Sequence, residues 1–451
     1  MDRWWVASDG PPMEGRLRSS SSSTTSTGTD THPILAAERS ERTMRVGTAV
    51  TTVDAAGMRA QNSSLLLNMI WRERQISRAE IARRTELSPS TVSAIVADLE
   101  RSGLVRSIGA GVSRGGRRPT LIGFCDDAFS LIGVEMGATH VTAALTDLRG
   151  RVRAYRHASH AVREDPKGTL QKVRELVQEV LDAERVPRRS VAGMGIAVPS
   201  PVHPSAPGKL SPLLVPAWRD YDVQESLRSA FGLPVFVDND ANLGALSECY
   251  WGAGVNGEDL AYIKLATGIG SGHIIHGDVY RGAGGTAGEI SHMAVDSSGP
   301  QCVCGLRGCL VTLIGSAALL ERARELMGRK DKRALTVREL VEGARAGEPA
   351  ARQVIDGLGH YLGIAVAGLL NLLNPAIVVL GGEISSVGDL LLDPLRASVR
   401  KRALSTSMAE TRIVTSALGD RAIAVGAATL VLQAALRDRT LFPLQHIGKP
   451  A

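Results

Sequence analysis

The first part of the chain with regular patterning carries its apolar residues at helical spacing. In residues 77–105, SRAEIARRTELSPSTVSAIVADLERSGLV, four apolar side chains occupy the i, i+3, i+4 and i+7 positions of one helix face: Val92, Ile95, Val96 and Leu99. Ser88 and Pro89 precede this face and predict an N-cap followed by Pro in the first turn. Gly103 follows it and predicts a left-handed cap. The pattern indicates a short helix with one buried stripe.

Two more helices are expected before this one, and two strands after it. Ser77 and Glu80 predict a capping box for a helix that ends near Thr85. The stretch NSSLLLNMIWRER, residues 62–74, has one apolar face. The stretch VRSIGAGVSRGGRRPTLIGF, residues 105–124, consists of two strand-like pieces around a tip rich in Gly and Arg. Three helices followed by such a hairpin are typical of a winged helix-turn-helix.

From residue 130 onward, strand-like apolar runs alternate with helical stretches. The runs are LIGVEMG (131–137), VAGMGIAVP (191–199), PVFVDND (234–240), LAYIKLATG (260–268) and AIVVLGG (376–382). This alternation predicts an α/β domain with mainly parallel strands. The most apolar run, 364–380, is interrupted by Asn371, Asn374 and Pro375, so we expect no membrane-spanning helix.

The excess charge of the chain is concentrated in the predicted winged helix. Residues 58–123 contain eleven Arg and five acidic residues, an excess of six that equals the formal net charge of +6 for all 451 residues. A basic segment beside an electrically balanced remainder is typical of a nucleic-acid-binding module joined to another domain. Residues 1–57, with the run RSSSSSTTSTGTDTH, lack apolar periodicity and predict a disordered leader.

Small polar side chains at the start of the last predicted helix suit a close approach to double-stranded DNA. They lie off its apolar face and allow the helix to enter a major groove. The arginines at the hairpin tip can reach phosphates or a narrow minor groove. The candidate DNA contacts are Ser90, Thr91, Ser93, Arg114, Arg117 and Arg118. A winged helix used for protein contacts is the alternative.

Three of the five cysteines lie within eight positions, in QCVCGLRGC, residues 301–309. Such a cluster serves redox chemistry, binds a metal, or arises by chance. Cys302 and Cys304 lack the C-x-x-C spacing of redox pairs. The N-terminus has no signal-peptide pattern, so we expect a reducing, cytoplasmic location at the nucleoid and no disulfide framework.

Five motifs follow one another in the second part of the chain. They are GVEMGATHVTAALTDLRG (133–150), GIAVPSPV (195–202), VDNDANLGALSE (237–248), LATGIGSGHIIHGDVYRGAGGTAGEISHM (265–293) and CVCGLRGC (302–309). Together with the winged helix, this order resembles the ROK family of repressors, open reading frames and sugar kinases, over about residues 60–440. The resemblance implies a two-lobed, actin-like (ribonuclease-H-like) α/β fold, with sugar and ATP meeting in the cleft.

The expected domain boundaries follow from the same patterns. The leader is expected at 1–57, the winged helix at 58–123, the ROK domain at 124–440 and a tail at 441–451.

The resemblance assigns the cysteine cluster to zinc and places a sugar site beside it. In the family one His and three Cys bind zinc, and thiolates with an imidazole make a closed, tetrahedral structural site. The matching residues here are His292, Cys302, Cys304 and Cys309. The resemblance also implies sugar binding by Asn239, Asp240, Glu289 and His292, with Asp240 as the base in the kinases.

The sugar motifs depart from the family pattern at three positions. Ser200 and Ser291 stand where the family has Gly, and Val311 stands where it has a sugar-binding Glu. The missing carboxylate removes an acceptor for two hydroxyl groups. We therefore expect weaker binding of a glucose-type pyranose, or a pocket suited to another ligand.

The first phosphate loop departs further. Kinases of the family carry D-x-G-G-T-K, whereas residues 135–140 read Glu-Met-Gly-Ala-Thr-His. The second loop is intact, and Gly268, Gly270 and Gly272 can present N–H groups to an anion. Because phosphoryl transfer depends almost wholly on placed charge, we do not expect the protein to use ATP and Mg²⁺.

The leading hypothesis is a DNA-binding repressor of carbohydrate-metabolism genes, without enzymatic activity. It would bind a sugar or sugar phosphate and act as a homodimer or homotetramer. The first alternative is a bifunctional ATP-dependent sugar kinase with a fused DNA-binding domain, of the glucokinase or N-acetylhexosamine kinase type. The second is a DNA-binding protein whose ROK domain serves dimerisation alone.

Overall fold

The structure, a computed structural model, describes residues 54–111, 118–255, 257–328 and 335–443. Most of the expected leader, residues 1–53, lies outside the described residues. The first helix begins at Ala55, with Asp54 as its N-cap, within the stretch expected to be leader. At the other end Phe442 is buried against Phe129, two residues beyond the expected end of the ROK domain.

The N-terminal part of the described chain is a three-helix unit with a small sheet. Its helices are α1 (Ala55–Glu73), α2 (Arg78–Thr85) and α3 (Pro89–Arg101). Its strands are β1 (Gln75–Ser77), β2 (Val105–Ala110) and β3 (Thr120–Phe124), which pair antiparallel in the order β1-β3-β2. These elements confirm the predicted winged helix-turn-helix.

Local sequence signals start and stop these helices as expected. The Ser88 side chain accepts a hydrogen bond from the Thr91 N–H, and Pro89 opens α3. Gly103 takes a φ of 73° after the end of α3. The capping box at α2 is only half formed: Ser77 accepts from the Glu80 N–H, but the Glu80 carboxylate accepts from the side chains of Arg83 and Arg84 instead.

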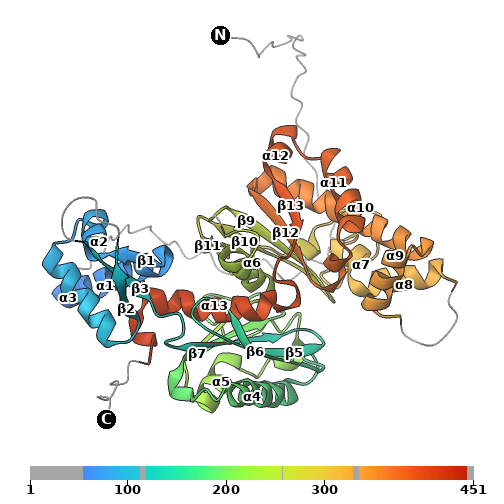
Figure 1. The fold of residues 1–451 in the computed structure, drawn as a ribbon. Helices are drawn as coiled ribbons and strands as arrows, with labels where there is room; N and C mark the ends of the chain where they lie inside the picture. Colours follow the sequence, from blue (N-terminus) through green and yellow to red (C-terminus); the bar gives the residue numbers. More distant parts are fainter. Residues whose placement is uncertain (1–53, 112–117, 256, 329–334, 444–451) are drawn as a thin grey trace, which may run out of the picture. The chain divides into compact units, whose positions relative to one another are not determined.

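The rest of the chain contains two five-stranded sheets with the same strand order. The first has the order β6-β5-β4-β7-β8 and consists of β4 (Ser130–Met136), β5 (His140–Thr146), β6 (Val152–Ser159), β7 (Val191–Val198) and β8 (Val235–Asn239). The second has the order β11-β10-β9-β12-β13 and consists of β9 (Leu260–Leu265), β10 (Ile269–Ile275), β11 (Asp278–Val279), β12 (Ile377–Gly381) and β13 (Arg412–Thr415). The repeated order supports the predicted actin-like α/β fold (Figure 1).

The expectation of mainly parallel strands is wrong. In each sheet the first three strands pair antiparallel, and only the last two are added in parallel. The connections 137–139 and 147–151 are too short for the crossover that a parallel pair requires. The sequence analysis did not predict the antiparallel strands. The strands β5, β6, β10 and β11 are less uniformly apolar than the five runs from which strands were predicted.

Helices cover both faces of the two sheets. On the outer face of the first sheet lie α4 (Pro166–Ala183) and α5 (Val223–Phe231). The second sheet packs with a cluster of helices: α7 (Leu310–Ile314), α8 (Ser316–Leu326), α9 (Val337–Ala346), α10 (Pro349–Leu373), α11 (Asp389–Arg400) and α12 (Ser405–Glu410).

Two helices occupy the middle of the domain and pack against each other. They are α6 (Asp240–Trp251), which contacts the second sheet, and α13 (Ala422–Arg437), which contacts the first. They approach so closely that a Cβ at Gly426 would lie 1.8 Å from the carbonyl oxygen of Leu243. Any larger residue at 426 would therefore push the two helices apart.

Two helical stretches, α10 and the region 419–437 around α13, are long and apolar enough to cross a membrane. The apolar windows of these stretches are 61% and 67% buried inside the protein. A helix that is apolar on most sides is also what the core of a large α/β domain requires. The packing of both helices therefore accounts for their composition.

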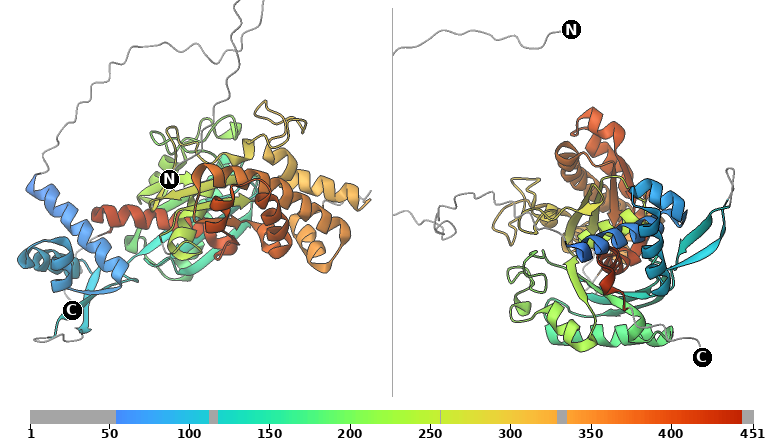
Figure 2. Two further views of the ribbon diagram at one scale, coloured as in Figure 1. Left: turned by 90° about the horizontal axis from the view of Figure 1, so that it is seen from above. Right: turned by 90° about the vertical axis from the view of Figure 1, so that its left-hand side faces the viewer.

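The winged helix is joined to the second part by α1 and the end of α13 (Figure 2). Ser64 Oγ donates to the carbonyl of Arg437 at 2.9 Å, and Asn68 Nδ2 donates to that of Leu436 at 2.8 Å. These carbonyls belong to the last turn of α13, where no intrahelical partner is available. The contact therefore satisfies groups that the end of a helix leaves open.

An aromatic cluster completes this junction. Trp71 of α1 donates to the carbonyl of Leu148 at 3.1 Å, and its ring lies 5.9 Å from the rings of both Tyr250 and Trp251. The Arg149 guanidinium lies 4.7 Å from the centre of the Trp71 ring. Because Tyr250 and Trp251 end α6, the winged helix contacts both central helices.

Candidate functional site

A pocket of about 320 Å³ opens where the two sheets meet α6. Its walls bring together segments that are far apart in the sequence. They come from the loop before β5, the end of β7, the start of α6, the turn between β9 and β10, and residues 289–311. The four sugar-site candidates all line it: Asn239, Asp240, Glu289 and His292.

Asn239 and Asp240 lie at the N-terminus of α6. The Asn239 side chain caps the helix by accepting from the N–H groups of Ala241 and Asn242, and its Nδ2 donates to the carbonyl of Ser200. An N-cap is the structural role that this motif would have in any loop. Asn239 nevertheless keeps one amide proton that faces no partner in the described chain, so it can also serve a ligand.

Glu289 supplies a second carboxylate to the pocket. Burial raises its pKa, and the negative charge of Asp240 raises it further. Both effects on the Glu289 pKa are expected when two carboxylates line one small pocket. Together they give the pocket two acceptors for hydroxyl groups.

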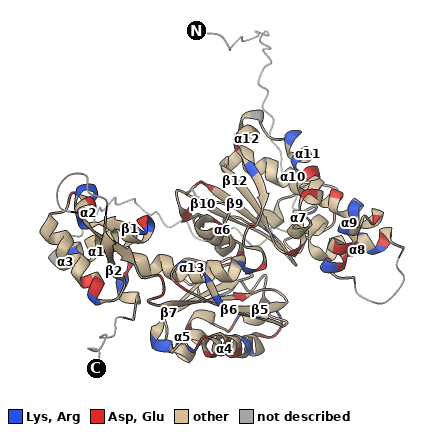
Figure 3. Ribbon diagram, in the orientation of Figure 1, with Lys and Arg blue, Asp and Glu red and all other residues tan. Residues whose placement is uncertain are grey.

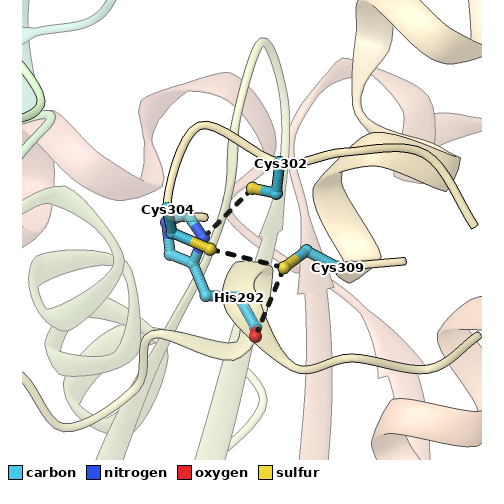
Figure 4. Close-up of side chains that lie close together, drawn as sticks. All are labelled: His292, Cys302, Cys304 and Cys309. Carbon is cyan, nitrogen blue, oxygen red and sulfur yellow. Dashed lines mark hydrogen bonds between the residues drawn. The ribbon is translucent and has the colours of Figure 1, made fainter. Parts of the chain in front are cut away.

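His292, which lines the pocket, lies close to the three cysteines of the cluster (Figure 4). Their ligand atoms all lie within 4.8 Å of one another. Sγ of Cys304 lies 3.6 Å from Sγ of Cys309, and Sγ of Cys302 lies 3.6 Å from Nδ1 of His292. A tetrahedral zinc site with Zn–S bonds of about 2.3 Å has S–S edges of about 3.8 Å. The cluster fits such an ion.

The chain around the cluster is bent to bring these ligands together. Gly305 and Gly308 take φ values of 92° and 64°, and a Cβ at Gly308 would lie 1.5 Å from the carbonyl oxygen of Asp296. The Leu306 N–H, above all, lowers the pKa of the Cys304 thiol, whereas burial, above all, raises the pKa of the Cys309 thiol to about 12. A metal ion requires thiolates, so it would have to displace the Cys309 proton on binding. Three thiolates and one imidazole would close the site, so a metal here would be structural.

The first phosphate loop is covered by its own histidine. The His140 ring lies so close to Gly137 that a Cβ there would be 2.3 Å from it. Nε2 of His140 lies 3.3 Å from Oε1 of Glu135, and the ring stacks on His157 at 5.1 Å. Burial would raise the pKa of Glu135, but the hydrogen bond with His140 and the charge of Lys264 outweigh it, and the pKa is lowered.

The second Gly-rich loop is only partly at the pocket. Gly268 and Gly270 line it, with no protein atom within 4 Å of a Cβ at Gly268. Gly272 instead lies inside β10, where a Cβ would be 2.3 Å from the carbonyl oxygen of Ala241 in α6. Gly272 is therefore required for packing against α6, and a Cβ at Gly270 would also lie only 3.2 Å from Cβ of Ala241, whereas the space beside Gly268 is open.

The three positions that depart from the family pattern all lie at the pocket. Ser200, Ser291 and Val311 line it. Ser200 is buried, and its hydroxyl accepts from the Ser211 N–H and donates to the carbonyl of Pro201. The Ser200 hydroxyl therefore holds the 200–211 loop, and Val311 presents a methyl surface to a ligand.

Lys264 is a pocket residue that the sequence reading did not select. It is the last residue but one of β9, and its Nζ donates to Oδ2 of Asp240 at 2.5 Å. Burial would lower its pKa, but the charges of Asp240 and Glu135 outweigh it, and the pKa is raised. In the sequence, the only indication of this residue is a lysine within the apolar run LAYIKL. The run matches no catalytic motif.

The candidate DNA contacts on α3 have the expected exposure. Ser90 and Ser93 are exposed, as is Ala94, whereas Thr91 is half-buried and bonds to Ser88 through its hydroxyl. Arg118 is exposed at the start of β3, while Arg114 and Arg117 lie outside the described residues.

Basic and acidic residues lie on the same helices of the winged helix (Figure 3), and many of its arginines form ion pairs within it. Glu80 binds Arg83 and Arg84, and Asp98 binds Arg59 and Arg101. Four exposed arginines have no such partner in the described chain: Arg72, Arg74, Arg106 and Arg118. Arg106 at the base of the wing was not among the sequence-based candidates, and only the ion-pair pattern singles it out.

Comparison with known proteins agrees with this architecture. The ROK family profile matches residues 131–434, and a winged helix-turn-helix DNA-binding profile matches residues 61–106. The chain is 32% identical to the xylose repressor of Bacillus subtilis (strain 168), over 84% of this chain and 97% of that protein. It is 30% identical to the N-acetylglucosamine repressor of Escherichia coli O157:H7, over 86% and 95%.

Solved structures show the same fold. A ROK family transcriptional regulator, homologous to the MLC protein of E. coli, is 26% identical with a TM-score of 0.72, over 85% of this chain and 98% of that one. A ROK family glucokinase from Streptomyces griseus, in complex with glucose and AMPPNP, is 29% identical with a TM-score of 0.60, over 67% and 99%. The chain therefore belongs to the ROK family and carries a winged helix-turn-helix DNA-binding domain before its ROK domain.

Proposed function

We propose that the protein is a sugar-responsive transcriptional repressor of carbohydrate-metabolism genes. The observation that carries this proposal is one compact unit that joins an exposed recognition helix to a pocket with two carboxylates. The repressor relatives named for xylose and N-acetylglucosamine support a sugar or sugar phosphate as the effector. A cytoplasmic location fits both a DNA partner and the free thiols of the cysteine cluster.

The polar groups of the pocket suit a polyhydroxylated ligand. Asp240 and Glu289 accept hydroxyl protons, and Asn239 donates one amide proton. A structural zinc held by His292, Cys302, Cys304 and Cys309 would fix the wall that carries Glu289. The metal itself would not react, because the four protein ligands complete its coordination.

A continuous helix connects this pocket with the DNA-binding domain. The first residue of α6, Asp240, lies in the pocket, and its last two, Tyr250 and Trp251, contact Trp71 of the winged helix. Trp251 also donates to Thr429 of α13 at 2.7 Å. A ligand that moves α6 by a small amount would therefore shift the base of the winged helix.

In a homodimer or homotetramer this movement would change the spacing of two winged helices. Two recognition helices must match half-sites that are fixed on the DNA, so spacing controls affinity. By linkage, the effector and the operator must change each other's affinity by the same factor.

Gel-shift titration with DNA from its own promoter region tests this proposal. We expect at least one of a panel of pentoses, hexoses, N-acetylhexosamines and their phosphates to change the operator affinity by about tenfold or more. If no member of the panel alters binding, the sugar-responsive function is rejected.

Sugar kinase activity is the second candidate, and the Gly268–Gly270 turn beside Asp240 favours it. The covered first phosphate loop opposes it, because the His140 ring lies against Gly137, where a phosphate would have to approach the backbone. A coupled assay of ADP release with the same sugars, with Asp240→Asn as control, decides between the two. Turnover that depends on Asp240 would establish a kinase.

A further inference from the structure

Lys264 occupies a position where an unpaired charge would be costly. It lies in β9, between β10 and β12, opposite Gly270 and Gly381. Its side chain is 11% exposed, and the strand around it is buried throughout. An ammonium group in such surroundings costs several kcal/mol unless partners compensate it. The lysine therefore needs either its carboxylate partners or a ligand, and it lines the pocket where the ligand would bind.

The carboxylate partners leave part of this group available. One ammonium proton goes to Oδ2 of Asp240, and Glu135 contributes its charge to the same group. The other protons of Lys264 have no acceptor in the described chain, and Oδ1 of Asp240 receives no hydrogen bond there. The pair thus offers the pocket a strong donor and a strong acceptor side by side.

Such a pair suits a sugar hydroxyl better than either residue alone. A hydroxyl group donates one hydrogen bond and accepts up to two. It can donate to Oδ1 of Asp240 while it accepts from the Lys264 ammonium, and hydrogen bonds with charged groups are the stronger ones. The same ammonium would repel a divalent cation at this place.

We propose that Lys264 is an effector-binding residue. Its ammonium group donates a hydrogen bond to a sugar hydroxyl group, and the same hydroxyl group donates to Asp240. This inference rests on the proposed sugar-responsive function and adds a specificity-determining residue to the same pocket. It also makes sugar binding independent of Mg²⁺ and nucleotide, because a fixed ammonium supplies the positive charge beside the carboxylates.

Calorimetric titration of the full chain tests this role, without nucleotide. The probes are D-xylose, D-glucose, N-acetyl-D-glucosamine and the 6-phosphates of the two hexoses. For the probe that binds the wild type best, Lys264→Met should weaken the affinity by about tenfold or more. Lys401→Met, which removes an exposed lysine at the end of α11 outside the pocket, should leave the affinity unchanged.

The sign of the effect separates ligand binding from a purely structural role. If Lys264 only pairs with Asp240, its removal frees that carboxylate, and sugar affinity should stay the same or rise. Either result would overturn the proposal. If Lys264→Met fails to fold, as judged by thermal melting, Lys264→Gln keeps a neutral donor and should still weaken binding.

The failure of the proposed function gives a different result. In that case no probe binds the wild type, and both proposals are rejected together. A wild type that binds a sugar equally well with and without Mg²⁺ and AMPPNP supports the proposal. Binding that requires Mg²⁺ and nucleotide would reject the role of Lys264 as the fixed cation.

Discussion

Two walls of the same pocket differ in the groups of side chains beside them. The zinc wall, formed by Glu289, Ser291, His292 and Val311, adjoins a complete set of four metal ligands. The phosphate wall, formed by Ala138, His140, Gly268 and Gly270, adjoins two contacts between polar side chains, Glu135 with His140 and Asp240 with Lys264.

The difference separates binding from transfer chemistry. A wall that only holds a ligand needs shape, fixed acceptors and a rigid base, all of which the cysteine cluster can maintain. Phosphoryl transfer needs positive charge aimed at a moving phosphoryl group. Here Nζ of Lys264 donates to Asp240, and Nε2 of His140 lies 3.3 Å from Oε1 of Glu135 in the covered first loop. These contacts support the proposed sugar-binding function over the alternative of a sugar kinase.

Removing a zinc ligand should give the largest effect of the tests on this comparison. Cys304→Ser should lose the one equivalent of zinc per chain that we expect, and its melting temperature should fall by about 10 °C. Metal binding is linked to folding, and about 4 kcal/mol produces such a shift in a domain of this size. Metal analysis and thermal melting measure both, with Cys125→Ser as the matched control. A metal-free wild type with the same melting temperature would reject the zinc assignment.

Neutralising the carboxylate of the zinc wall should reduce sugar affinity. Glu289→Gln should weaken binding by about tenfold, since hydrogen bonds to a charged acceptor contribute about 1.5–3 kcal/mol. Titration calorimetry measures the change, and Glu342→Gln on the exposed face of α9 is the control. Unchanged affinity would mean that the ligand does not reach Glu289.

The charges of the phosphate wall should make the fold sensitive to acid. The pKa of Glu135 is lowered in the folded protein relative to its ordinary value of 4.5. Its carboxylate therefore stabilises the fold above that value, and this contribution is lost as the pH falls below 4.5. Between pH 7 and pH 4, urea unfolding should show that the free energy of unfolding falls more for the wild type than for Glu135→Gln. An equal loss in both proteins would contradict this.

Restoring the kinase-type phosphate loop should have the smallest effect. The triple variant Glu135→Asp, Ala138→Gly, His140→Lys should release ADP no faster than background, because Val311 still stands where the family has a sugar-binding Glu. Its sugar affinity, measured in parallel, verifies that the pocket is intact. Sugar-dependent turnover of ATP by this variant would show that the first loop alone had blocked the reaction.

The sequence predicted the winged helix well because its signals are local. Ser77, Ser88 and Gly103 act on backbone groups within four residues, and the apolar stripe of α3 follows from helical spacing. The ion pairs that neutralise many of its arginines were not predicted. They depend on which helix faces bring Glu73, Glu80, Asp98 and Glu100 against basic side chains.

Only those pocket residues that belong to a recognisable sequence motif were predicted. The motifs selected Asn239, Asp240, Glu289 and His292, and the structure brings these four together. Lys264 was missed because nothing in its own strand distinguishes it from a core position. Gly272 was assigned to the phosphate loop because its spacing fits, although it packs against α6.

The sequence by itself determined the helices of the winged helix, most of their caps and the candidate donor set for a metal, because each of these depends on residue type and short spacing. Only the tertiary structure decided which charges are free. Asp240 and Lys264 are 24 residues apart on different elements, and their ion pair exists because β9 lies against the start of α6. Whether a carboxylate can act as a base depends on such neighbours, and long-range packing supplies them.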